Sequence, residues 1–151
     1  MTPRLTVPIF TMLLAFLAFT GRSHAEPPAL TIVSPAPNAE IILGGDQEKA
    51  IDVMVKAANF TIRPAGQCNG NPQCGHLHLK IDPAGDTCNI PGRPYNSMNS
   101  DTGGEVIKAR FGHCQSPSGT HVIGILLAND NHAPLIIDGK PVTASVTVTA
   151  K

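Results

Sequence analysis

The chain has 151 residues, with 11 basic and 11 acidic side chains and no net formal charge. This length fits one domain, and the charge balance argues against electrostatic capture of nucleic acid or anionic lipid. Aromatic residues make up only 4% of the chain and Trp is absent, whereas Gly and Pro number 14 each. Such a composition fits short strands joined by many turns better than packed helices, and it favours a small all-β domain.

The first 25 residues have the pattern of a secretory signal peptide. Arg4 supplies a positive start, Pro8–Phe19 is apolar, and Ser23-His24-Ala25 forms a small-x-small cleavage site. The apolar stretch is about a dozen residues long, whereas a membrane-crossing helix needs roughly 20, and no later segment is apolar enough to span. We therefore expect cleavage near Ala25 and a periplasmic or secreted mature chain, residues 26–151, without an integral membrane segment.

Seven segments of the mature chain carry strand signals, in the order Leu30–Val33, Ile41–Leu43, Ala50–Ala57, His76–Asp82, Glu105–Phe111, Thr120–Ala128 and Val142–Ala150. Several of them alternate apolar and polar residues, as strands with one buried face do. The segment Thr120–Ala128 is apolar on both faces, which is typical of a central strand. No helical period appears after the signal segment. The pattern predicts an all-β fold, an immunoglobulin-like antiparallel β-sandwich of about seven strands.

Four cysteines, an even number in a short exported chain, predict two disulfides and no free thiol. If the strands His76–Asp82 and Thr120–Ala128 are antiparallel neighbours, Cys88 and Cys114 lie at the same end of the sheet. Cys74 and Cys88 flank a strand roughly 20 Å long, which is beyond disulfide reach. We therefore expect the pairs Cys88–Cys114 and Cys68–Cys74.

The same topology brings His76 and His78 close to His132. Two histidines at i and i+2 on a strand point to the same side and can bind one copper or zinc ion, and Asp130 offers an additional oxygen. The alternative is that the pair lies on a solvent-exposed face beside Lys80 and makes ordinary hydrogen bonds. Both interpretations remain open from the sequence.

Two further histidines, His113 and His121, fall at the opposite end of the domain in this topology. We expect them to be structural or exposed, and a second metal site there is not predicted. No Gly-x-Ser-x-Gly elbow is present to support a serine nucleophile, so the sequence favours a non-enzymatic domain.

Three segments resemble an uncharacterised domain family of exported bacterial proteins: Gly75–Asp82, Gly119–Leu127 and Asn131–Pro134. That family has a His-rich strand ending in Asp, then Gly-Thr-His, then Asn-His-x-Pro. The resemblance extends from about Ser34 onward and implies a sandwich rather than a particular reaction. This chain differs in carrying His-x-His where relatives often have consecutive histidines, and in its four cysteines.

Two weaker likenesses concern metal. The segments Ser34–Asn38 and Asp138–Val142 are similar to the ends of periplasmic copper-resistance sandwiches, although the N-terminal histidine of those proteins is missing here. Gly75–His78 is similar to the His-x-His strand of copper-zinc superoxide dismutases, but the rest of that ligand set is not recognisable. These likenesses bear on metal binding, and the dismutase activity is not carried over to this chain.

The sequence thus supports two functional hypotheses. The first is a disulfide-stapled, exported sandwich whose His76, His78 and His132 bind copper or zinc. The second is an accessory module that uses its long loops, Asn59–Gly75 and Pro83–Gly104, to hold a protein or a cell-envelope glycan.

Overall fold

The computed structural model describes residues 26–85, 88, 97–98 and 103–151. The expected signal peptide, residues 1–25, lies outside the described residues, as does much of the expected loop Pro83–Gly104. Within the described part of the chain, no helix is long and apolar enough to cross a membrane. The same part contains two disulfides, which are common in extracellular domains and rare in cytosolic ones.

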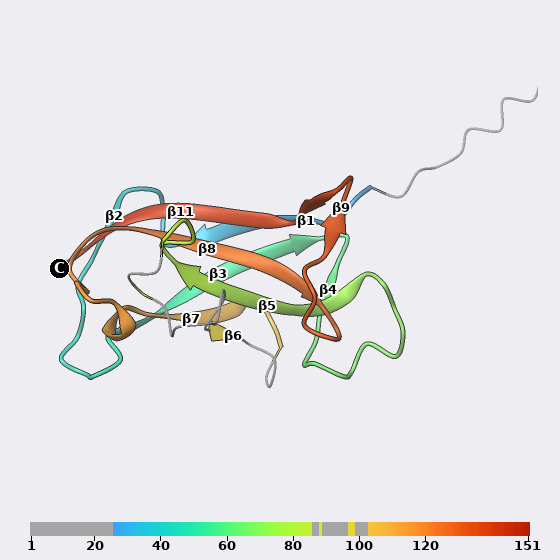
Figure 1. The fold of residues 1–151 in the computed structure, drawn as a ribbon, viewed down its shortest axis with the longest axis horizontal. Helices are drawn as coiled ribbons and strands as arrows, with labels where there is room; N and C mark the ends of the chain where they lie inside the picture. The colour runs from blue at the N-terminus through green and yellow to red at the C-terminus, as the bar shows by residue number, and fades with distance from the viewer. Residues whose placement is uncertain (1–25, 86–87, 89–96, 99–102) are drawn as a thin grey trace, which may run out of the picture.

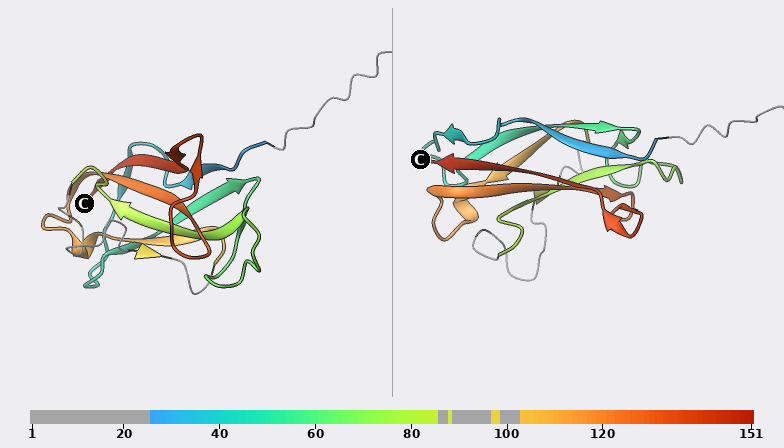
Figure 2. Two further views of the ribbon diagram at one scale, coloured as in Figure 1. Left: turned by 45° about the vertical axis from the view of Figure 1, so that its right-hand side comes forward. Right: turned by 90° about the horizontal axis from the view of Figure 1, so that it is seen from above.

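Two β-sheets pack face to face, as the view from above in Figure 2 shows. The smaller sheet is antiparallel and has the order β1-β3-β7. Its strands are β1 (Ala29–Ser34), β3 (Ala50–Ala58) and β7 (Val106–Arg110). A single turn of 3-10 helix, η1 (Phe111–His113), follows β7.

The larger sheet has the order β2-β11-β8-β5-β4, with β6 paired to β5 (Figure 1). Its strands are β2 (Ala39–Ile41), β4 (Thr61–Ile62), β5 (Cys74–Ile81), β6 (Ser97–Met98), β8 (Gly119–Asn129) and β11 (Thr143–Ala150). A small hairpin of β9 (Ile136–Ile137) and β10 (Lys140–Pro141) connects β8 to β11. The predicted all-β sandwich is therefore confirmed, and β8 is a central strand.

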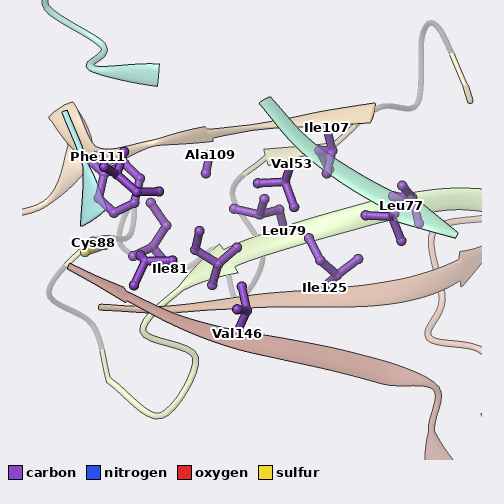
Figure 3. Packing of buried hydrophobic residues seen from close by; sticks show 14 of the residues in the cluster. Val53, Leu77, Leu79, Ile81, Cys88, Ile107, Ala109, Phe111, Ile125 and Val146 are labelled. Carbon is purple, nitrogen blue, oxygen red and sulfur yellow. The ribbon is translucent and has the colours of Figure 1, made fainter. Parts of the chain in front are cut away.

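The core fills the space between the sheets because each long strand alternates its apolar residues inward. On β5 the residues Leu77, Leu79 and Ile81 are at most 2% exposed. Figure 3 shows them packed against apolar side chains from both sheets, including Val53, Ile107, Phe111, Ile125 and Val146. Burying each such side chain contributes roughly 1.5–3 kcal/mol, which makes this layer the main source of stability.

The structure differs from the expected sandwich in two details of the larger sheet. The strand expected at Ile41–Leu43 forms at Ala39–Ile41 and pairs with β11 in parallel. The segment Asn59–Gly75, expected to be entirely loop, contains β4, which also pairs in parallel with β5. Both are short strands that follow a long strand of the smaller sheet, so the chain crosses between sheets before it pairs.

The ladder between β5 and β8 decides where the site residues lie. His76 pairs with Ala128 and His78 with Leu126, in alternation with the core pair Leu77 and Leu127. Because neighbouring residues of a strand point to opposite faces, the two histidines lie on the outer face of the larger sheet.

Candidate metal centre

The histidines of β5 are on the outer face of the sheet, but they are not exposed. His76 is completely buried and His78 is 8% exposed, as is Lys80 on the same face. The interpretation of this pair as ordinary solvent-exposed histidines is therefore wrong. Sequence periodicity identified the face correctly, but it does not show that a distant turn of the chain covers that face.

That covering turn follows β8 and carries His132. The backbone N–H of His132 donates to the Asn129 carbonyl at 3.1 Å, and the N–H of Asn129 donates to the Ala133 carbonyl at 2.9 Å. The side-chain oxygen of Asn129 also accepts from the N–H of Ala133 at 3.0 Å. His132 itself has φ +68°, a conformation that non-glycine residues rarely adopt. The turn therefore holds the exposed His132 in one position beside β5.

Gly75 permits the strands to approach at this point. It pairs with Asn129, and a Cβ atom at position 75 would lie 2.0 Å from the Ala128 carbonyl oxygen. No residue with a side chain fits there without separating β5 from β8. Glycine directly before His76 therefore sets the spacing between the two parts of the site.

The three imidazoles converge through their nitrogens. His76 Nε2 lies 2.9 Å from His78 Nε2 and 2.9 Å from His132 Nδ1. One ring nitrogen carries either one proton or one lone pair, so His76 Nε2 cannot make two well-directed hydrogen bonds at once. A metal ion between the rings would accept a lone pair from each, and all three ligand atoms lie within 4.8 Å of one another.

The buried pair is held in the neutral form that metals require. The pKa of His78 is lowered to about 4 by burial first, and then by the nearby His76 and His132. Burial and His132 also lower the pKa of His76, against a smaller opposing effect of Asp130. Both rings therefore present lone pairs at neutral pH without releasing protons.

The second ring nitrogen of His76 has no hydrogen-bond partner. Within the described residues, His76 Nδ1 is buried and unpartnered. An unsatisfied buried polar atom costs about 1–3 kcal/mol, whereas an apolar side chain at this position would cost nothing of the kind. His121 Nε2, at the other end of β8, is also buried and unpartnered, so this cost is shared by both ends of the sheet and does not by itself identify a metal ligand.

Asp130 was expected as an oxygen ligand, but its carboxylate is used elsewhere. Oδ1 accepts from the N–H of Gly66 at 2.6 Å, and Oδ2 accepts from the N–H of Cys68 at 3.4 Å. These contacts tie the His132 turn to the loop that the Cys68–Cys74 disulfide closes. Asp130 is therefore placed to position His132, and it is not among the converging ligand atoms of the three histidines.

The opposite end of β8 carries a second histidine, His121, which is 6% exposed. His121 Nδ1 lies 2.8 Å from Asp82 Oδ2, and the other oxygen of Asp82 accepts from the N–H of Val122 at 2.9 Å. His121 also lies close to Cys88 and Cys114, but these sulfurs form a disulfide and are not available as thiolate ligands. Among the described residues, the His76, His78 and His132 group is the one of the two that could hold a metal ion without breaking a disulfide.

The structure thus brings together the three histidines that the topology argument selected, and it contains the Cys68–Cys74 and Cys88–Cys114 pairs. His113 lies apart from the cluster, in η1. Sequence reasoning missed the spacing role of Gly75, the Asn129 turn and the pairing of Asp82 with His121. The Asn-Asp-Asn-His run was a signal for a tight turn, because Asn and Asp tolerate such geometry.

No family model matches this chain, and no curated protein matches it. Two solved structures have a similar arrangement of strands. The fibronectin(III)-like modules of CbhA from Clostridium thermocellum are 10% identical with a TM-score of 0.41, covering 81% of this chain and 95% of that one. The endo-β-1,4-mannanase from Thermotoga petrophila is 11% identical with a TM-score of 0.42, covering 85% of this chain and 21% of that one.

Proposed function

We propose that this protein is an exported β-sandwich that binds one copper or zinc ion through His76, His78 and His132. The observation that carries the proposal is the convergence of three imidazole nitrogens, two of them from buried rings, at separations of 2.9 Å. Imidazole suits both copper and zinc.

Export is the second part of the proposal. It rests on the signal-like residues 1–25 and on the two disulfides. Expression of the full chain in a bacterial host, followed by intact-mass measurement of the periplasmic product, tests it. We expect loss of a segment ending near Ala25 and a mass four hydrogens below that of the reduced chain. A cytoplasmic product of full length would contradict export.

Calorimetric titration of the exported product with Cu(II) and with Zn(II) tests the metal site. We expect saturable one-to-one binding at pH 7.5 and weaker binding at pH 4, because the pKa of His78 is about 4 and protonated imidazole does not bind metal. The double variant His76→Ala, His78→Ala is expected to weaken binding at least about 100-fold. The control His113→Ala removes a histidine outside the cluster and should leave the affinity unchanged.

Two results would overturn the metal proposal. One is the absence of saturable binding to the wild-type protein, and the other is undiminished affinity in the double variant while circular dichroism shows it folded. Binding of an envelope protein or glycan through Asn59–Gly75 would then be the hypothesis to pursue, by chelator-insensitive capture that a loop deletion abolishes.

A further inference from the structure

We infer that the three-histidine centre is a tetragonal Cu(II) site with one open in-plane position, which binds a small exogenous anion. This inference rests on the proposed metal function and adds the coordination geometry and the class of ligand. Its basis is the spacing of the donor atoms, the order in which the rings are buried, and the engagement of the nearest carboxylate.

The spacing of the nitrogens distinguishes two geometries. Metal–imidazole bonds are about 2.0–2.1 Å long, so two nitrogens are about 3.4 Å apart at a tetrahedral angle and about 2.9 Å apart at a right angle. The separations from His76 Nε2 are 2.9 Å to both His78 Nε2 and His132 Nδ1. Right angles between neighbouring ligands are the preference of Cu(II), whereas structural zinc sites are tetrahedral.

His76 occupies the middle of the arrangement. Its ring centroid lies 4.9 Å from that of His78 and 4.5 Å from that of His132, while the latter two are 5.7 Å apart. A square plane with His76 as the central ligand places His78 and His132 opposite each other. The fourth corner of that plane then lies opposite His76.

The difference in burial between the rings indicates that the fourth coordination position lies toward solvent. His76 is fully buried and His78 nearly so, whereas His132 is exposed. A metal ion held by the three nitrogens would have the fully buried His76 on its inner side and the exposed His132 beside it. The position opposite the most deeply buried ligand therefore faces away from the sheet.

The described part of the chain offers no fourth side chain from His, Cys, Asp or Glu within this group. Asp130, the acidic residue two positions before His132, accepts hydrogen bonds from the N–H groups of Gly66 and Cys68. Three neutral imidazoles leave both positive charges of Cu(II) uncompensated. A small anionic donor at the open position is therefore the favoured exogenous ligand.

Azide binding to the copper-loaded protein tests the inference. The protein is first titrated with Cu(II) until one equivalent is bound, and its electron paramagnetic resonance spectrum is recorded. We expect an axial spectrum with nitrogen hyperfine structure, as tetragonal copper gives. Azide should then produce a saturable azide-to-copper charge-transfer band, with one azide per copper and no loss of copper on gel filtration.

The variant His132→Asn provides the matched comparison, because Asn tolerates the positive φ of this turn and the fold should be retained. Removal of the exposed ligand should open a second position, so that two azide ions bind each copper. His113→Ala should behave as the wild-type protein, with one azide per copper.

The outcomes separate the two levels of the proposal. If Cu(II) does not bind, the metal function itself fails before azide is added. If Cu(II) binds but azide gives no saturable band, or if the resonance spectrum is that of a tetrahedral site, the open tetragonal geometry is wrong and the metal function stands. An azide stoichiometry of two in the wild-type protein would also overturn the inference.

Discussion

The two ends of the larger sheet each place buried histidine beside a disulfide, three imidazoles at one end and His121 alone at the other. At one end, His76 faces two other imidazoles on the outer side of β5, and the nearby Asp130 binds backbone N–H groups. At the other end, His121 lies 2.8 Å from the carboxylate of Asp82 and packs edge-on against Phe111 in the core. The contact with Asp82 occupies one ring nitrogen of His121, whereas the imidazoles that face one another at the other end bring several ring nitrogens together.

Removing each disulfide in turn tests whether the two ends of the sheet differ in their contribution to stability and to metal affinity. The Cys88–Cys114 bridge spans 26 residues and the Cys68–Cys74 bridge spans 6. Chain-entropy arguments give losses in unfolding free energy of about 3.5 and about 2 kcal/mol, respectively, for replacement by serine pairs. Metal affinity should show the reverse order, because only Cys68–Cys74 closes the loop that Asp130 holds. Urea unfolding measures the two stability losses, and calorimetry measures the two metal affinities. Equal metal affinities in both variants would contradict the proposal that the Cys68–Cys74 loop supports the metal site.

Substitution of Gly75 should damage both the ladder and the metal site. A Cβ at this position meets the Ala128 carbonyl, so Gly75→Ala must push β5 away from the end of β8. We expect about 2–3 kcal/mol of lost stability and at least a tenfold loss of metal affinity. Gly45→Ala is the control, because Gly45 has no positive φ and its Cβ would meet nothing within 4 Å. Retention of full affinity in Gly75→Ala would show that the close approach does not set the spacing of the ligands.

The pH dependence of stability should come from the metal-site end. Because the folded-state pKa of His78 is lowered to about 4, the unfolded chain binds more protons than the folded chain as the pH falls from about 6.5 to 4. The metal-free protein should therefore lose stability across this window, on the order of 2 kcal/mol. Urea midpoints measured in the presence of a chelator should show this slope. The slope should be reduced in the variant His76→Gln, His78→Gln, and an unchanged slope would place its origin elsewhere.

Asp130 should have the smallest effect of the four. Asp130→Asn weakens the hydrogen bonds to Gly66 and Cys68 without removing a ligand. Residues that orient metal ligands typically change affinity 10–100-fold, and we expect about tenfold here. Asp138→Asn in the next turn removes the same charge at an exposed residue and should leave the affinity unchanged. If both variants weaken metal binding equally, the effect comes from the loss of a negative charge and not from the position of His132.

The sequence predicted the sandwich and the candidate ligands well because both depend on strand period and strand order. Alternation in His76–Asp82 and the apolar run Thr120–Ala128 identified two neighbouring strands. Their antiparallel pairing alone placed His132 near His76. The same pairing led to the cysteine pairs that the structure contains.

Burial of the site was not predictable in this way. Whether His76 is covered depends on a turn 56 residues further along the chain, held by the Asn129 side chain and by Asp130. The pairing of Asp82 with His121 spans 39 residues and leaves no periodic trace. The parallel strands β2 and β4 are too short, at three and two residues, to show any period.

The ladder register of β5 against β8 also links the metal site to folding kinetics. A slip of one residue would turn His76 and His78 into the space between the sheets and expose Leu77 and Leu79. His132 is carried on the turn after β8, so the three ligands assemble only after the two strands have aligned correctly. The rate of metal binding during refolding, measured by stopped flow, would therefore report the rate at which β5 and β8 pair in the native register.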